Sequence, residues 1–310
     1  MRKGLFVCLA ALALASCSTN TKRQEDSNKL KVLSWNVWHA GHSKAFPEKG
    51  CEGALGILKH SNADVITMIE TYGSADQVAD HLGFYHRLLS SNLSIYSRYP
   101  IVETYTFPDS ISTFNFGGVM INKNGQKIRV FDTWLHYLPG STSVPRDKSE
   151  EEILAWETAG TRDEEVKKVV TLLKPFLAES DSIPVFVSGD FNVHSHLDWT
   201  EEVKDYNYHG GKVVNWPVSV TMIEAGFKDS FREMNPDVKK NYGVSWIVND
   251  KEHPDYKGDR IDFIYYAGKN TKVVESNVYN QDLGKILDYD GKQFFYSSDH
   301  GFVTSTFEIK

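Results

Sequence analysis

The sequence predicts a single α/β domain that contains two β-sheets. Strand-like segments are numerous, hairpins join several of them, and helical segments lie between them. Neither an internal repeat nor a second linker interrupts the 310 residues, so one domain is expected over 29–310. The composition, with 41% hydrophobic and 24% charged residues, is that of a globular chain with enough apolar residues for a core.

Strands are expected where apolar residues alternate or run continuously, and helices where they recur every three to four residues. The expected strands are 30–37, 64–69, 85–89, 93–97, 101–106, 115–122, 127–136, 185–192, 245–248, 261–266, 272–278 and 302–308. The expected helices are 47–60, 74–82, 163–177 and 218–225. Asn124-Gly125 predicts a hairpin between two of these strands. The segment 138–160 is expected to be a long loop of the kind that often carries function.

The first 28 residues are expected to precede the domain. Two positive charges, a short apolar run and then Leu14-Ala15-Ser16-Cys17 predict a signal peptide over 1–16. The tetrad resembles a bacterial lipobox, in which Cys17 becomes lipidated, and an ordinary signal peptide with an incidental cysteine is the alternative. A flexible, polar tether follows over 17–28. We therefore expect an exported lipoprotein, held by its N-terminal lipid on the periplasmic or surface face of the cell envelope.

Cysteine content and net charge narrow the possible classes. Cys8 would leave with the signal peptide and Cys17 would carry lipid, so Cys51 stands alone and is expected to be a buried apolar residue without a disulfide. The formal net charge of −7 argues against a protein that holds nucleic acid polymers mainly by neutralising phosphates. A locally basic cleft stays compatible with this charge.

Polar side chains follow the predicted strands where the strands end. Asp190 and Asn192 end the apolar segment 185–192, and residues two apart on a strand point the same way. A carboxylate beside an amide suits the binding of water, a metal ion or a phosphoryl oxygen, although the same pair could simply open a turn. Further polar residues at strand ends are Asn36, Glu70, His136, Asp262 and the segment Ser297-Ser298-Asp299-His300. Together they predict a site at one edge of the sheets.

Six short motifs occur in a fixed order between residues 30 and 309. They are Ser-Trp-Asn-Val at 34–37, Ile-Glu at 69–70, Ser-Ile-Tyr-Ser-Arg-Tyr-Pro-Ile at 94–101, Ser-Gly-Asp-Phe-Asn at 188–192, Arg-Ile-Asp at 260–262 and Ser-Asp-His at 298–300. In this order they resemble the endonuclease/exonuclease/phosphatase superfamily. The resemblance implies a four-layer α/β sandwich of two packed mixed β-sheets flanked by helices. It also implies a divalent-metal-dependent phosphoric ester hydrolase with its site at one edge of the paired sheets.

The resemblance implies a metal site. Glu70 would be the main ligand of Mg²⁺ or Mn²⁺, helped by Asn36 and Asp299. Carboxylate and amide oxygens are the ligands that these hard cations prefer. Because the sequence has no cluster of Cys and His ligands, structural zinc is not expected.

The resemblance also implies the catalytic groups. His300 would be the general base that activates water, and Asp262 would orient its ring. Asp190 and Asn192 would position water and a phosphoryl oxygen, where charge builds up during an in-line displacement.

One strand departs from the family pattern. Many relatives have Asn-Thr-His-Leu where this chain has Asp132-Thr133-Trp134-Leu135, and His136 follows. We expect His136 to contact the phosphate in place of the family histidine and Trp134 to be core or a wall of the substrate cleft. A structural role for His136 is the alternative.

Four more histidines follow predicted site residues in the sequence. They are His39, His42, His194 and His196. His194 is the best candidate to line the substrate pocket, and simple solvation in a loop is the alternative for each.

The sequence favours hydrolysis of a phosphodiester or phosphomonoester in a small molecule or a lipid headgroup. A secreted nuclease acting on DNA or RNA is the first alternative, and a catalytically inactive ligand-binding lipoprotein is the second. A carbohydrate-binding or structural lipoprotein fits less well, because the aromatic residues alternate within strands and are expected in the core. We expect a monomer that meets the membrane only through its lipid and has no protein partner.

Overall fold

A computed structural model describes residues 28–310 except 43–45, 47 and 248. The predicted signal peptide, Cys17 and most of the tether therefore lie outside the described residues. Within them, no helix is both long and apolar enough to cross a membrane.

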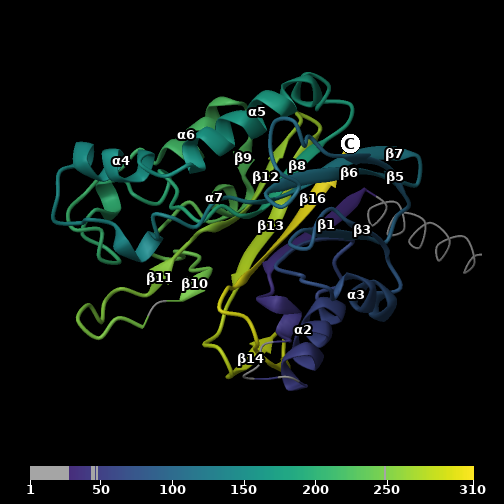
Figure 1. Cartoon of the computed structure of the whole chain (residues 1–310), viewed down its shortest axis with the longest axis horizontal. Helices are drawn as coiled ribbons and strands as arrows, with labels where there is room; N and C mark the ends of the chain where they lie inside the picture. The colour runs from purple at the N-terminus through teal and green to yellow at the C-terminus, as the bar shows by residue number, and fades with distance from the viewer. Residues whose placement is uncertain (1–27, 43–45, 47, 248) are drawn as a thin grey trace, which may run out of the picture.

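Two mixed six-stranded sheets pack face to face in the described part of the chain, with helices on their outer faces (Figure 1). The first sheet contains, in spatial order, β13 (Thr271–Tyr279), β16 (Phe302–Ile309), β1 (Lys29–Asn36), β2 (Val65–Ile69), β4 (Ser94–Ser97) and β3 (Tyr85–Leu88). The second contains β5 (Ile101–Tyr105), β6 (Phe116–Lys123), β7 (Gln126–Trp134), β8 (Val185–Asp190), β12 (Asp262–Ala267) and β9 (Lys228–Asp229). The pairs β1–β2 and β7–β8 are parallel, and the other pairs are antiparallel.

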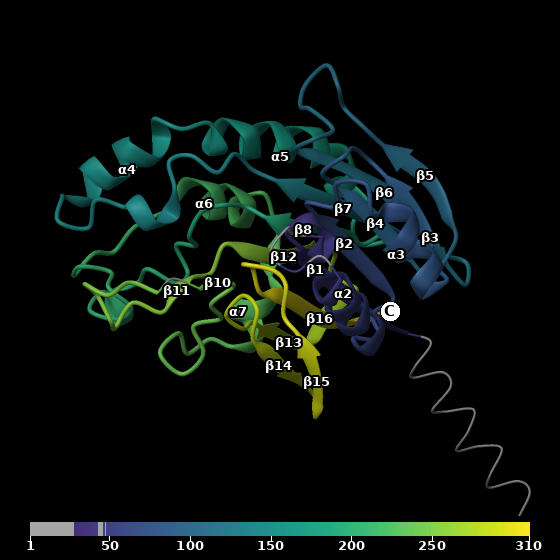
Figure 2. The same cartoon turned by 60° about the horizontal axis from the view of Figure 1, so that its bottom comes forward.

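Helices complete the four layers (Figures 1 and 2). The first sheet is covered by α2 (Lys49–His60) and α3 (Ala75–Leu82), and the second by α5 (Arg162–Ala178) and α6 (Pro217–Glu224). A third apolar layer lies between the sheets and includes Val32, Phe186 and Ile264, which are fully buried. Since both faces of the central strands are covered, their sequences are nearly continuous apolar runs. The predicted four-layer sandwich is confirmed.

Apart from shifts at their ends, the observed strands and helices follow the predicted ones closely, with three main exceptions. The segment 138–160 contains a helix, α4 (Glu150–Thr158), and was therefore wrongly expected to be only a loop. Ser149 and Glu152 form a capping box at its start, and three acidic residues lie in its first turn, which favours a helix N-terminus. The hairpin of β14 (Ile286–Tyr289) and β15 (Lys292–Phe295) was not expected, although Asp290-Gly291 is a turn signal.

The third exception is the segment 245–248, where the strand is shorter than expected. Only β10 (Trp246–Ile247) forms there and pairs with β11 (Gly258–Asp259), while Val248 lies outside the described residues. The remaining short elements are α7 (Ser230–Met234) and the 3₁₀ turns His39–Gly41, Ser141–Ser143 and Glu201–Val203. Cys51 is buried on α2, as predicted.

Asp132 on β7 is a carboxyl group buried between the two sheets. It is 0% exposed, and its partner on β8, Ser188, shares a hydrogen bond with Thr67 of the first sheet. Burial raises the pKa of Asp132 well above its ordinary value of 3.8, although the backbone amides of Thr133 and Met68 oppose the rise in part. Neither carboxyl oxygen has a well-directed hydrogen bond among the described residues. The folded protein therefore favours the protonated form.

We expect Asp132→Asn to stabilise the protein at pH 8 and to have almost no effect at pH 4. Since the folded pKa lies above the unfolded one, the stability that Asp132 supports is complete below the unfolded pKa and falls as the pH rises towards the folded one. The substitution should raise Tm by roughly 2–6 °C at pH 8, measured by circular dichroism. Asp80→Asn, at an exposed position of α3, is the control. A lower Tm of the Asp132 variant at both pH values would show that the ionised carboxylate is needed.

Candidate active site

Side chains from both sheets meet at one edge of the sandwich, where the labelled strands β1, β2, β8 and β12 lie close together (Figure 2). Asn36 ends β1, Glu70 follows β2 and Asp190 ends β8. Asp262 opens β12, and His300 lies two residues before the start of β16. Because β12 and β16 run antiparallel to β8 and β1, their beginnings lie where the other two strands end. The predicted clustering of these residues is thus found.

The imidazole of His300 lies between two buried carboxylates. Its Nδ1 is 3.0 Å from Oδ2 of Asp262, and its Nε2 is 3.7 Å from Oδ2 of Asp190. The hydroxyl of Ser245 donates a hydrogen bond of 2.6 Å to the same Asp262 oxygen. Asp262 and Asp190 are each 1% exposed and His300 is 7% exposed, so water screens these interactions little. The arrangement resembles the base and orienting acid of hydrolases.

The backbone of His300 is held independently of its ring. Its carbonyl accepts hydrogen bonds from the Trp35 indole at 3.1 Å and from the Tyr296 hydroxyl at 2.6 Å. Its amide donates to the Ser298 hydroxyl, which in turn donates to the Asn36 carbonyl at 2.6 Å. These contacts therefore fix the start of β16 against the end of β1, whatever side chain residue 300 carries.

Charge determines which group of this cluster accepts a proton. Burial lowers the pKa of His300, but the charges of Asp262 and Asp190 and the hydrogen bond to Asp262 outweigh it and raise the pKa to about 10. Burial raises the pKa of Asp190 to about 7, against the opposing charge of His300. The imidazole therefore keeps its proton at neutral pH, and Asp190 titrates near pH 7. The proton acceptor is better described as the coupled Asp190–His300 pair than as His300 alone.

Asn36 connects this cluster to Glu70. Its side-chain amide donates to Oε1 of Glu70 at 3.3 Å and to Oδ2 of Asp190 at 3.2 Å. Glu70 has a left-handed backbone, φ 60°, and its amide donates to the buried side chain of Asn92. Burial raises the pKa of Glu70, and the amide of Asn36 opposes the rise. Because a partly buried carboxylate is costly to ionise without a positive charge nearby, Glu70 is suited to bind a cation.

The residues at this edge fit a divalent cation. Oδ1 of Asp299 is buried without a hydrogen bond among the described residues, and the charge of Asp299 acts on Glu70. The carboxylate oxygens of Glu70 and Asp299 are donors that hard cations prefer. Asn36 turns its Nδ2 towards Glu70, and its Oδ1 accepts from the Trp38 amide. Asp190, Asp262 and His300 form a second possible set, with ligand atoms within 4.8 Å of one another. Asp262 and His300 are already hydrogen-bonded to each other in this second set, which favours the set around Glu70.

A tight turn presents Asp190 and Asn192. The Asn192 amide donates to Oδ1 of Asp190 at 2.9 Å, and its side chain donates to the Leu135 carbonyl at 2.9 Å. Gly189 has φ 146°, and a Cβ there would lie 1.9 Å from the Thr133 carbonyl oxygen, so no other residue fits. The amide nitrogen of Asn192 is thus engaged with the backbone, which leaves its oxygen for water or substrate.

A buried ion pair holds this turn in place through a hydrogen bond to its backbone. Arg162, at the start of α5, donates to the Asn192 carbonyl and makes a two-pronged contact with Glu157 near the end of α4, where Nε lies 2.9 Å from Oε1. Both side chains are 1% exposed. We call this the Glu157–Arg162 clamp. The sequence carried no signal for it, because a Glu and an Arg on either side of a helix break usually face solvent.

Trp134 and His136 lie beside the turn without reaching the catalytic cluster. Trp134 pairs with Asp190 across the parallel strands β7 and β8 and is half-buried. His136 lies beyond the end of β7, its ring is 6.4 Å from that of Trp134, and its Nδ1 accepts from the Leu138 amide. No contact of His136 with Asp190, Asn192 or His300 is found among the described residues. Its role as a phosphate contact stays a prediction.

His194 does not line a pocket, contrary to our expectation. It is 2% exposed, stacks on Trp216 with ring centroids 4.8 Å apart, and has Nε2 at 2.9 Å from Asp259. A ring enclosed in this way cannot touch a substrate. Of the other histidines, His39 lies near enough to Glu70 to lower its pKa, whereas His196 bonds to Ser219.

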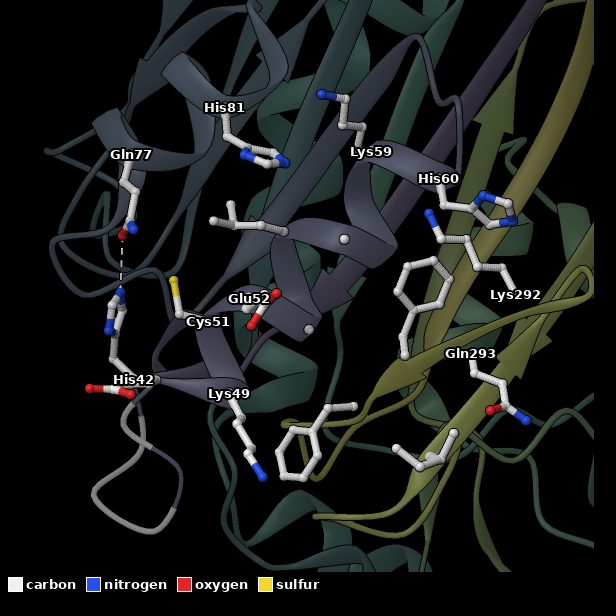
Figure 3. Close-up of a pocket in the computed structure, with 17 residues that line it drawn as sticks. His42, Lys49, Cys51, Glu52, Lys59, His60, Gln77, His81, Lys292 and Gln293 are labelled. Carbon is white, nitrogen blue, oxygen red and sulfur yellow. Dashed lines mark hydrogen bonds between the residues drawn. The ribbon is translucent and has the colours of Figure 1, made fainter.

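A cavity of about 1170 Å³ lies between α2, α3 and the β14–β15 hairpin (Figure 3). Its labelled residues include Cys51, His42, His81 and Lys292, and none of the predicted catalytic or metal residues lines it. His42 reaches across it to Gln77 at 3.1 Å. Among the described residues, the cavity has no acid–base cluster like that of the strand ends, so the strand ends are the better candidate for the active site.

A family model described as Endonuclease/Exonuclease/phosphatase family matches residues 33–300. Among curated proteins, the chain is 27% identical over 292 residues to an uncharacterised protein of Caenorhabditis elegans, with 85% of each chain covered. It is 24% identical over 265 residues to an exodeoxyribonuclease of Bacillus subtilis, covering 82% of this chain and 94% of that one.

Solved structures share the fold. The crystal structure of D. rerio TDP2 complexed with single strand DNA product superposes with a TM-score of 0.56 and 17% identity. The match covers 90% of this chain and 98% of that chain. At this identity, the likeness shows the fold alone.

Proposed function

We propose, on the premise that this chain belongs to the endonuclease/exonuclease/phosphatase family, that its strand-end cluster hydrolyses a phosphodiester or phosphomonoester in a small molecule or a lipid headgroup. Members of this family are phosphoester hydrolases that depend on a divalent metal, so the chain is an enzyme of this class. The observation that supports the proposed site best is the His300 imidazole held between Asp262 and Asp190. An inactive ligand-binding protein would not need this buried and fully assembled acid–base group.

The coupled Asp190–His300 pair can accept the proton that the attacking water loses. As the water oxygen bonds to phosphorus and the bond to the leaving oxygen breaks, the water proton must move to a base. Asp190, with a pKa near 7, can take it, and protonated His300 can donate its Nε2 hydrogen to an oxygen that gains charge. Asp262 and Ser245 keep the ring oriented during this transfer.

Mg²⁺ (or Mn²⁺) is the proposed cofactor. Glu70 and Asp299 would hold it through carboxylate oxygens, with Asn36 beside Glu70, and Oδ1 of Asp299 has no hydrogen-bond partner among the described residues. When bound, such a cation polarises a phosphoryl oxygen and stabilises the charge that develops on it.

The main alternative is a nuclease, and the names of two similar proteins support it. One is named an exodeoxyribonuclease, and one similar structure holds a DNA product. The net charge of −7 opposes tight binding of a polyanion, because such binding depends on neutralising phosphates. We therefore place the small-molecule or lipid substrate first.

We further propose that the enzyme works as a monomeric lipoprotein in the cell envelope. Support comes from the lipobox-like tetrad that ends at Cys17 and from the polar residues 18–28 behind it.

A metal-dependent activity screen tests the proposed function. The substrates are bis-p-nitrophenyl phosphate, p-nitrophenyl phosphate, a choline phospholipid, DNA and RNA, each with Mg²⁺, with Mn²⁺ and with EDTA. We expect turnover that EDTA abolishes and that is highest on a small or lipid phosphoester. Highest activity on DNA or RNA would favour the nuclease instead, and no metal-dependent turnover on any substrate would overturn the proposal.

A further inference from the structure

Four aromatic rings form a partly exposed surface at the end of β7. The Trp134 ring lies 5.7 Å from Phe114 in an edge-on arrangement, 6.4 Å from His136 and 6.1 Å from Tyr137. His136 and Tyr137 stack at 5.0 Å. Tyr137 is 53% exposed, and the other three are half-buried. We call these four residues the aromatic platform. Rings that could have been buried in the core are here left open to solvent, which is typical of a surface that binds something.

The platform adjoins the proposed catalytic cluster. Trp134 pairs with Asp190 in register on parallel strands, so the two side chains leave the second sheet on the same face. The next residue, Leu135, donates its amide to the Asp190 carbonyl and accepts from the Asn192 side chain. On the Phe114 side, Asn92 links the two regions, because it donates to the Phe114 carbonyl and accepts from the Glu70 amide. The platform is therefore next to the place where a phosphoester would meet Asp190.

The chemistry of the platform favours a flat, uncharged ring over a charged group. None of its four residues is a Lys or Arg, and the acidic side chain of Glu165 accepts from the backbone amide of His136 rather than from a ring. The His136 Nδ1 is occupied by the Leu138 amide. What remains for a ligand is ring faces and edges, which bind other rings by offset stacking or edge contacts.

Resting on the proposed function, we infer that the aromatic platform binds a planar aromatic ring in the substrate, next to the phosphate held at Asp190 and His300. The ring can belong to an aryl ester or to a nucleobase. Both present the same flat surface to the platform. The structure therefore supports a planar ring, and the experiment distinguishes an aryl ester from a nucleobase.

Binding of small phosphonates to the full chain with Mg²⁺ tests this inference, with Kd values measured by ligand-observed NMR. Phenylphosphonate and cyclohexylphosphonate share their charged group and ring size but differ in planarity. We expect phenylphosphonate to bind about tenfold more tightly than the cyclohexyl compound, from stacking on the platform. Trp134→Ala should remove most of this preference and Trp134→Phe should keep it. Tyr137→Ala, at an exposed position, serves if the tryptophan variant does not fold.

Two control variants and a second ligand pair sharpen the result. Tyr85→Ala removes a ring that is 54% exposed on β3, outside the platform, and should leave the preference unchanged. Thymidine 5′-monophosphate compared with 2-deoxyribose 5-phosphate isolates the nucleobase. A preference that depends on Trp134 in this pair alone would identify a nucleobase, and one in the phosphonate pair alone an aryl group.

Several outcomes would overturn the inference. Equal affinity of the planar member and its non-planar or ring-less partner in both pairs would do so. So would a preference that is lost in Lys292→Ala but kept in Trp134→Ala, because the ligand would then occupy the cavity of Figure 3. Failure of the proposed function is separate, since it means no hydrolysis in the activity screen, whatever the Kd values are.

Discussion

His300→Gln is expected to lower kcat by roughly 10²–10⁴-fold while the fold is kept. The ring lies between Asp262 and Asp190, and glutamine can neither hold a proton for Asp190 nor pair with Asp262 as a cation. The backbone contacts of residue 300 with Trp35 and Tyr296 do not involve the ring, so the start of β16 should stay in place.

The measurement is kcat and KM on the best substrate of the activity screen, together with Tm. His81→Gln is a matched control, because His81 lines the cavity of Figure 3 and not the sheet edge. A His300 variant with near-normal kcat and an unchanged pH profile would show that this imidazole is not used.

In the wild type, we expect kcat/KM to rise with pH as Asp190 loses its proton near pH 7 and to fall as His300 loses its proton near pH 10.

Glu70→Gln is expected to lower kcat/KM by roughly 10²–10³-fold at low Mg²⁺, since the charge stabilisation that a metal supplies is worth several kcal/mol. Glutamine keeps the shape of the side chain and can still contact Asn36, but it lacks the negative charge that would attract the cation. High Mg²⁺ should restore part of the activity, because the loss lies in metal affinity.

A metal titration of activity tests this expectation. The midpoint of the titration should shift to higher Mg²⁺ in Glu70→Gln and should not move in Glu52→Gln, which changes an exposed glutamate of the cavity in Figure 3. If both variants titrate like the wild type, the metal is held elsewhere, and the set formed by Asp190, Asp262 and His300 becomes the better candidate.

The sequence predicted the sheet-edge cluster well because its signals are local. Asp190 and Asn192 end an apolar run, Glu70 follows another, and Asp299-His300 precede a third, so strand periodicity and motif order were enough to bring them together. The exact strand ends mattered little for bringing these residues together, but they did matter for His136. The strand predicted over 127–136 ends at Trp134, so His136 lies beyond the strand and its position could not be read from strand geometry.

The contacts of the supporting residues could not be predicted, since each joins positions distant in sequence, even where the residue itself lay in a motif, as Ser298 does. Ser298 reaches Asn36 across 262 residues, and Ser245 reaches Asp262 across 17. Serines are common, and nothing nearby marks one that orients a carboxylate. His194 failed for the opposite reason, because its position after Asn192 suggested a site while its surroundings are aromatic core.

The Glu157–Arg162 clamp has a consequence for how this enzyme can diverge in evolution. Loss of either partner would leave the other as a buried, unpaired charge, so the two positions are expected to change together or not at all. The stretch before α4 carries a buried cation of its own, because the Arg146 guanidinium lies over the rings of Trp199, Tyr208 and Tyr256. Diversity among close homologues should therefore concentrate at exposed positions such as Asp147 and Lys148, while Glu157 and Arg162 keep their separation of five positions. Selection on the turn at Asn192 therefore also constrains Arg162, thirty residues earlier in the sequence.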